Sequence, residues 1–227
     1  TMDTKFENQN NEEWFQNGSI VTEYNQNLNE NFYIKASSAI QTSRNYIQTT
    51  DQANELSYAS SLTTSITLYG YQLLDENDNM DISFSTYQAT QSSANNKTIP
   101  KVIPSINYYS GLKKINNIDY SNSINFYNII REENTNIHAE QQQKVNYKIS
   151  ASKDFTKYNS KLKIQSELYN QLYSTKNKKI DNQNISNNYY KIFPIVGLSI
   201  ETPIRHKNSN AIITPHSNLI ISSGQSN

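Results

Sequence analysis

The residues with the best spacing for chemistry in this 227-residue chain form an acidic turn. Asp75, Asn77 and Asn79 have the spacing of the first ligands in a calcium-binding loop. Such a loop requires glycine at its sixth position and glutamate at its twelfth, where this chain has Met80 and Thr86. The match fails at both positions, so the segment is interpreted as a solvated turn between two strands.

No other set of residues forms a recognisable reactive site. The histidines, His138, His206 and His216, lack the paired spacing of zinc ligands, and the absence of cysteine excludes thiolate sites and disulfides. The sequence has no nucleophile elbow, phosphate loop or dinucleotide fingerprint, and no spacing singles out two carboxylates as acid and base. We therefore expect a protein that is not an enzyme, with no metal site and no cofactor.

Charge and hydropathy narrow the class further. Basic and acidic residues are balanced at 20 each, so neither a nucleic-acid partner nor a polybasic membrane patch is expected. No run of about 18 apolar residues is present, and no transmembrane helix is predicted. The mean hydropathy of -0.79 is still compatible with a membrane β-barrel, because half of each strand of such a barrel faces a watery lumen.

The sequence predicts β-strands that each have one apolar face and one polar face. Residues 137–151 alternate almost without error between apolar and polar side chains, and residues 161–173 repeat the pattern. Alternation with a period of two is typical of a β-strand with one apolar face. Both stretches exceed the usual length of about 5 to 6 residues and reach the roughly 9 to 11 of a strand that crosses an outer membrane.

The cost of placing charge in lipid predicts the orientation of these strands. A Lys or Arg on the lipid side of a barrel costs about 2 to 4 kcal/mol at the membrane midplane. Lys161, Lys163 and Glu167 are therefore expected to face the lumen or to lie beyond the membrane, with Leu162, Ile164 and Leu168 facing lipid. In the preceding strand we expect Val145, Tyr147 and Ile149 to face lipid, and Lys144, Asn146 and Lys148 to face the lumen.

Similar alternation predicts about nine to eleven strands with polar connections, and no helix. The further strands are expected at residues 18–25, 31–41, 56–74, 80–88, 99–109, 118–130, 190–204 and 211–222. The apolar phase of residues 56–74 slips near Gly70, which favours a β-bulge there. Residues 75–79 would connect this strand to the next as a hairpin, and residues 176–188 are predicted to form a long hydrophilic loop.

Tyrosines and prolines each allow two interpretations. The 17 tyrosines could stack on ligands, but tyrosine is also common in the aromatic girdles of membrane barrels, and Tyr169 and Tyr173 are assigned to a girdle.

Prolines remove a donor from the β-ladder, so they mark either strand starts and edges or a weakened, bent strand. The prolines concerned are Pro100, Pro104, Pro194 and Pro203.

The alternation favours an all-β fold, namely a partial antiparallel transmembrane β-barrel. Two alternatives are a disordered asparagine-rich segment and a soluble β-sandwich adhesin. The sustained alternation argues against disorder, and strand length distinguishes the barrel from the sandwich. Residues 1–17 are expected to form a polar lead-in, for which a loop is one option. Residues 18–227 are expected to form the barrel segment, truncated at both ends.

Three segments, in this order, resemble the LptD family, also called the OstA or organic-solvent-tolerance family. They are residues 56–70 followed by 80–88, residues 98–108, and residues 190–204 followed by 213–219. The likeness covers most of residues 44–222. The positions that carry it are Gly70, Pro100, Pro104, Pro194, Gly197, Pro203 and Pro215.

The resemblance implies an outer-membrane protein of a Gram-negative bacterium that inserts lipopolysaccharide (LPS) into the outer leaflet. In this family a large barrel is plugged by the lipoprotein LptE, receives LPS from periplasmic bridge proteins, and opens sideways into outer-membrane lipid. The chain would then be a central part of such a barrel. Another outer-membrane barrel, such as a porin-like channel or a barrel enzyme, is the alternative.

Overall fold

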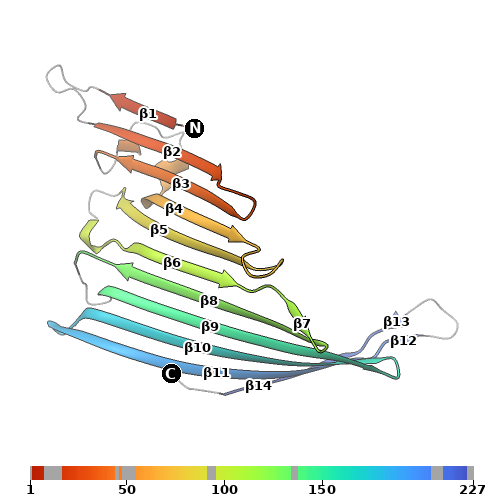
Figure 1. The fold of residues 1–227 in the computed structure, drawn as a ribbon. Coiled ribbons are helices and arrows are strands. Elements are labelled where there is room, and N and C mark those ends of the chain that lie inside the picture. Colours follow the sequence, from red (N-terminus) through yellow and green to blue (C-terminus); the bar gives the residue numbers. More distant parts are fainter. Residues whose placement is uncertain are drawn as a thin grey trace.

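The computed structural model describes residues 2–7, 17–43, 46–47, 55–90, 96–133, 138–205 and 212–223. In these residues a 12-stranded antiparallel sheet dominates, with the order β1-β2-β3-β4-β5-β6-β8-β9-β10-β11-β14 and with β7 paired to β8 (Figure 1). β12 and β13 form a separate two-stranded sheet. Almost every strand therefore lies beside its neighbour in sequence, as in an up-and-down barrel wall. The sheet is open, and it is a single layer rather than two facing sheets (Figure 1).

The strands lengthen along the sheet. The first six are β1 (Met2–Glu7), β2 (Asn17–Asn27), β3 (Phe32–Gln41), β4 (Ser61–Tyr71), β5 (Asn79–Ala89) and β6 (Lys101–Tyr109). The long ones are β8 (Ile118–Ile130), β9 (Ala139–Lys157), β10 (Ser160–Ile180) and β11 (Gln183–Glu201). The short ones are β7 (Lys113–Ile115), β12 (Ile204–Arg205), β13 (Ile212–Ile213) and β14 (His216–Ser222). Two 3-10 turns, η1 (Glu55–Tyr58) and η2 (Asn96–Thr98), precede β4 and β6.

Most of the predicted strands are present, with shifted ends. The strand expected at residues 118–130 is β8 without change, and β4 and β5 form the predicted hairpin. Residues 56–58, expected at the start of the strand at residues 56–74, belong instead to the turn η1. Residue 137 lies outside the described residues. Within residues 1–17, Met2–Glu7 forms β1, which pairs with β2.

The hydrophilic loop predicted at residues 176–188 is wrong. β10 and β11 continue through this region as a hairpin whose turn is only Asp181 and Asn182, with φ angles of 48° and 64°. Positive φ at both turn residues matches the twist of the flanking strands, and asparagine tolerates that conformation. The hairpins at residues 116–117 and 158–159 use the same kind of turn. The prediction failed because both faces of this hairpin end are polar, so no alternation marks the strands.

The β-bulge predicted at Gly70 is also wrong. The register is continuous through Gly70, which pairs with Phe32 on β3 and with Met80 on β5. A Cβ atom at Gly70 would lie 3.1 Å from side-chain carbons of Phe32 and Leu73. Glycine therefore leaves room for two large apolar side chains. The apparent slip in phase arises because Tyr69, beside Gly70, belongs to the opposite face of the strand.

One irregular part of the sheet is in β6. Its register shifts between Val102 and Ser105 against β8, and the peptide bond between Ile103 and Pro104 is cis. The side-chain amide of Asn128 on β8 donates to the carbonyl of Ile103. Pro104 therefore lies inside a strand but at a bulge, where a missing ladder donor is tolerated.

The other prolines lie where the ladder needs no donor. Pro100 directly precedes β6, while Pro203 and Pro215 lie between β11 and β14 and outside both strands. Pro194 is inside β11, and its carbonyl accepts from the amide of Ser223 at 3.3 Å. Because the N and the C=O of a strand residue point to the same side, the missing donor of Pro194 faces the end of β14 and not β10.

The described residues bury very little apolar side chain. The buried cluster consists of Ala39, Tyr46, Ile47 and Leu62, with Val21 and Leu56 packed against it. Large apolar side chains elsewhere are exposed, including Ile66 and Phe84 at 44% and Val196 at 49%. No helix among the described residues is long and apolar enough to cross a membrane. Many large apolar side chains of the described strands therefore lie on the surface of the sheet.

Candidate functional site

One face of the sheet is an exposed apolar surface that runs across eight strands. A single row of paired residues from β3 to β11 is apolar at every position. The row is Ile34, Leu68, Ile82, Ile106, Phe126, Val145, Leu172 and Tyr190. Soluble monomers rarely expose an apolar patch larger than a few hundred Å², so this face requires an apolar environment. We call it the apolar belt, comprising this row and the residues of the same face beside it.

The belt runs obliquely across the strands. On β3 it is centred near Ala36, and on β11, where it extends from Tyr190 to Ile200, near Ile195. Lys35 is in register with Tyr189 through the intervening strands, and Ala36 therefore lies level with Asn188. The centre thus moves about seven residues over the seven steps from β3 to β11. A shift of about one residue per strand corresponds to a strand tilt of about 35°, the value expected in a closed barrel.

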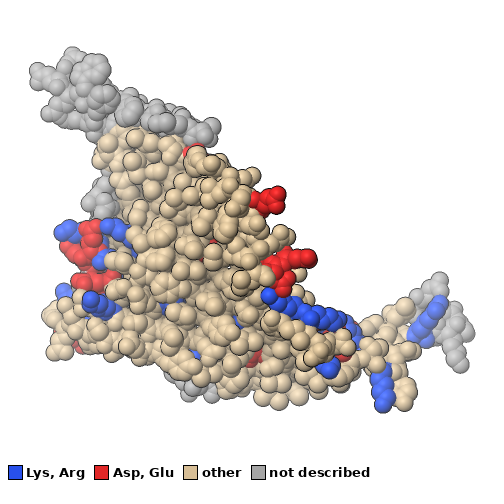
Figure 2. Space-filling model, viewed as in Figure 1, with Lys and Arg blue, Asp and Glu red and all other residues tan. Residues whose placement is uncertain are grey.

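The height of the belt matches a membrane. The eleven residues from Tyr190 to Ile200, ten steps along the strand, span about 33 Å along β11, or about 27 Å across the membrane at that tilt. Outer-membrane barrels carry an apolar band about 25 Å tall. In the view of Figure 2, charged side chains gather toward the two ends of the strands, and the centre is largely free of them.

The opposite face, which we call the polar wall, begins one residue away on every strand. Beside the apolar row runs a row of Tyr33, Tyr69, Asp81, Asn107, Asn125, Asn146, Gln171 and Lys191. Its members bond to one another across strands. Asn107 donates to Asp81 at 2.8 Å, Asn125 to Asn107 at 2.9 Å, and Gln171 to Asn146 at 3.0 Å. These hydrogen bonds fix neighbouring side chains to one another across the strands. The amide N–H groups and oxygens that they do not use can face water.

A pocket of about 400 Å³ lies on the polar wall over β8 to β11. Two neighbouring rows of paired residues line it. One row is Asn125, Asn146, Gln171 and Lys191, and the other is Ser123, Lys148, Tyr169 and Phe193. The pocket thus combines amides, two ammonium groups and two aromatic rings, which together suit a polar ligand with an apolar face.

The charges in this pocket are arranged by specific contacts. The Lys148 ammonium lies 3.0 Å from a Glu167 carboxylate oxygen and 5.0 Å from the centroid of the Tyr169 ring. Tyr169 in turn donates to the other Glu167 oxygen at 3.0 Å. The Lys191 ammonium lies 5.6 Å from the centroid of Phe193, and no ion pair of Lys191 occurs among the described residues. The local balance is two cations against one anion.

The fold, the faces and the sequence together identify the family. The family model for LptD, LPS transport system D, matches residues 16–216. The chain belongs to the LptD family. This LptD-family chain is therefore part of the LPS transport and assembly system of the outer membrane, and its two-faced sheet is part of an outer-membrane β-barrel. No curated protein matches the sequence.

The family match confirms the resemblance drawn from the three ordered segments, and the single continuous sheet rules out the β-sandwich. The predicted division of β9 into an apolar face and a polar face is confirmed. Val145 lies in the apolar row, whereas Asn146 lies in the polar row and Lys148 in the pocket.

The girdle assignment of Tyr169 and Tyr173 is wrong. Tyr169 pairs with Lys148 in the pocket, and Tyr173 stacks on Tyr189 with the ring centroids 6.1 Å apart. Both share the phase of the charged residues on β10, so they belong to the polar wall of this LptD-family sheet. The sequence alone places both tyrosines in phase with Lys161, Lys163 and Glu167. Tyr190, where the belt begins on β11, is a tyrosine of the apolar face at a girdle position.

The acidic turn has partners of its own. Asp75 lies 3.0 Å from Lys113, and both carboxylate oxygens of Asp78 accept backbone amides, from Leu73 at 2.6 Å and Leu74 at 2.9 Å. The bond from Lys113 is the main reason that the pKa of Asp75 is below its ordinary value. Among the described residues, no group of three or more potential metal ligands occurs. The turn thus has a structural role, because the Asp75–Lys113 ion pair attaches the connection between β4 and β5 to β7.

The histidines and the remaining family-like positions are scattered. His216 lies 3.3 Å from Glu201, His138 lies before β9, and His206 is outside the described residues. Gly197 pairs with Gln165 on the polar wall, where a Cβ atom would lie 2.7 Å from the Gln165 side chain. The sequence patterns did not single out the pocket, since its residues come from four strands. The cross-strand register that assembles them is not a local signal.

Proposed function

We propose that this chain forms a central part of the barrel wall through which LPS is inserted into the outer leaflet of the outer membrane. The observation that carries the proposal is the two-faced sheet, with an apolar belt about 27 Å tall behind a polar wall. LPS has both acyl chains and a charged saccharide, so a transporter needs both surfaces. The family match supports the same process.

The finer features follow the family. In the proposal, the 12-stranded sheet, β1 included, is one segment of a larger barrel. An LptE-like lipoprotein plugs the lumen, and periplasmic bridge proteins deliver LPS to it. A lateral opening elsewhere in the barrel releases the acyl chains into outer-membrane lipid. The family match and the two-faced sheet support these assignments.

Depletion of the full-length protein in its own cells tests the proposal. We expect LPS at the cell surface to fall as the protein is lost, and LPS to accumulate on the periplasmic side. The measurement is surface LPS by antibody binding to intact cells, with total LPS as the reference. Unchanged surface LPS after depletion would contradict the proposal.

A porin-like channel is the main competing function. Purified full-length protein in planar bilayers distinguishes the two, because a plugged transporter is expected to show little steady conductance. Large, stable ion conductance together with normal surface LPS on depletion would favour the channel.

A further inference from the structure

The pocket on β8 to β11 has a composition that points to one class of ligand. We propose that it binds a saccharide carrying a phosphate or carboxylate group. The inference rests on the proposed function, in which this saccharide is part of the LPS that passes the polar wall. The aromatic rings, the amides and the Lys191 ammonium each match one part of such a ligand.

The aromatic part of the pocket matches the apolar side of a sugar ring. Tyr169 and Phe193 are directly paired across β10 and β11, and both side chains line the pocket on the polar wall. Elsewhere on this wall Asn125, Asn146 and Gln171 line the same pocket. The C–H bonds on one side of a pyranose pack against aromatic rings, whereas an ordinary hydrated lumen gains nothing from a half-buried phenylalanine.

The amides match sugar hydroxyls. Gln171 uses one amide hydrogen on Asn146, with 3.0 Å between Nε2 and Oδ1, and Asn125 uses one on Asn107 at 2.9 Å. Each side chain keeps one further N–H donor and a carbonyl oxygen. These fixed donors and acceptors can replace the water molecules that hydrate a sugar, without first having to be ordered.

The charge distribution selects an anion. Lys148 has its counter-ion in Glu167 at 3.0 Å, and Tyr169 donates to the same carboxylate at 3.0 Å. Lys191 lies at the other edge of the pocket, over Phe193, and has no ion pair among the described residues. An anionic group beside Lys191 would balance the pocket, so Lys191 is the residue that we expect to bind phosphate or carboxylate directly.

The test uses the full-length protein with its native partners, and compares binding of native LPS with binding of LPS treated with phosphatase. Lys191→Gln removes the proposed anion contact. Lys163→Gln is the matched control, because Lys163 lies on the same polar phase of β10 but outside the pocket. Lys191→Arg keeps the charge, and migration of unheated samples in gels verifies that each variant is folded.

We expect Lys191→Gln to weaken binding of native LPS about five- to tenfold, since partly solvated charge-assisted contacts have modest strength. Lys191→Arg should restore most of the affinity, and Lys163→Gln should retain it. Phosphatase-treated LPS should bind the wild type and Lys191→Gln equally, if phosphate is the group recognised. A remaining difference would assign Lys191 to a carboxylate of the saccharide.

The results also separate the pocket from the proposed function. Equal binding of native LPS by Lys191→Gln, Lys163→Gln and the wild type would overturn the pocket and leave the function standing. Failure of folded wild-type protein to bind LPS at all would overturn the proposed function itself.

Discussion

Gly111 connects the end of β6 to β7 in a conformation that favours glycine. Its φ angle is +69°, and a Cβ atom there would lie 2.4 Å from the backbone oxygen of Asn77. We expect Gly111→Ala to destabilise the full-length barrel by about 1 to 3 kcal/mol, because both the backbone and its neighbour must move. Thermal unfolding of the purified protein, followed by gel migration, measures the effect.

Gly197→Ala is the control for that substitution. The added Cβ would meet only the side chain of Gln165, at 2.7 Å, and a flexible side chain can rotate away. A loss of stability at Gly197 equal to that at Gly111 would contradict the account of the turn.

The Asp75–Lys113 ion pair makes the contribution of this turn to the stability of the fold depend on pH. The hydrogen bond from Lys113 lowers the pKa of Asp75, and the same bond raises the pKa of Lys113. A lowered carboxyl pKa stabilises the fold above the ordinary value of 3.8, and this stabilisation is lost as pH falls through the folded-state pKa.

We therefore expect Asp75→Asn to lower the thermal stability of the full-length protein at neutral pH, and this effect to shrink as the pH falls below 3.8. The ordinary pKa of Lys113 is 10.5, so the pair remains charged through the neutral range. The measurement is the difference in melting temperature between variant and wild type from about pH 3 to pH 8. A difference that grows as the pH falls would contradict this sign.

At the scale of elements, β11 carries the belt and the polar wall on adjacent residues. Val196 is on the apolar side and 49% exposed, while Ile195 pairs with Glu167 on the polar wall. Val196→Arg places a cation near the centre of the belt and is expected to cost about 2 to 4 kcal/mol. Ile195→Arg should be tolerated, because its side chain faces the lumen.

The amount of folded full-length protein in the outer membrane measures both arginine variants. Val196→Arg should reduce it strongly and Ile195→Arg should not. Equal reduction by both variants would contradict the assignment of one side of β11 to lipid and of the other side to water.

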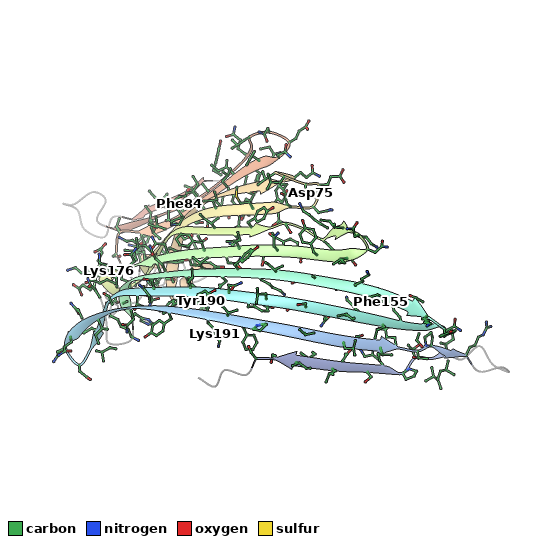
Figure 3. All side chains as sticks on the ribbon, turned by 60° about the horizontal axis from the view of Figure 1, so that its bottom comes forward. Asp75, Phe84, Phe155, Lys176, Tyr190 and Lys191 are labelled. Atoms are coloured by element: carbon green, nitrogen blue, oxygen red, sulfur yellow. The ribbon has the colours of Figure 1, made fainter. Side chains whose placement is uncertain are left out.

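One outward lysine needs a separate explanation. Lys153 pairs with Ile164 of the apolar face, at the edge of the belt on β9. Its ammonium lies 5.3 Å from the centroid of Phe155. The long apolar stem of lysine can lie along the belt while the ammonium reaches the membrane interface. Figure 3 shows Phe155 and Lys176 at opposite ends of the long strands, where the membrane interfaces are expected.

The sequence predicts the faces of these elements better than their ends or partners. Alternation is a local property, so the orientation of Val145 and Asn146 could be derived from their neighbours alone. The hairpin at residues 176–188 could not, because it has polar residues on both faces. The contact between Asp75 and Lys113 joins two different strand connections, and no local pattern encodes such a pair. The pocket was missed for the same reason.

At the scale of the whole molecule, connection length predicts the topology. At one edge of the sheet the strands are connected by residues 8–16, 42–60, 90–100 and 131–138 and by the turn 181–182. At the other edge the connections at 28–31, 72–78, 116–117 and 158–159 are short, while residues 202–215, with β12 and β13, form a longer one. Outer-membrane barrels have long extracellular loops and short periplasmic turns. The β10–β11 hairpin end, with Lys178, is therefore expected outside the cell and Asn159 in the periplasm.

Cysteine labelling of intact cells tests this topology, since the chain has no native cysteine. A membrane-impermeant maleimide should label Lys178→Cys in intact cells and Asn159→Cys only after the outer membrane is opened. The reverse pattern would invert the orientation.

The central claim is that neighbouring residues of one strand face lipid and water in turn. The most direct measurement is nitroxide scanning of β11 from residue 189 to 200 in full-length protein in proteoliposomes. The collision rate with oxygen, which partitions into lipid, should peak at Tyr190, Ile192 and the following even positions. The rate with a water-soluble nickel reagent should peak at the odd ones. High nickel accessibility at every position, without a period of two, would contradict the account.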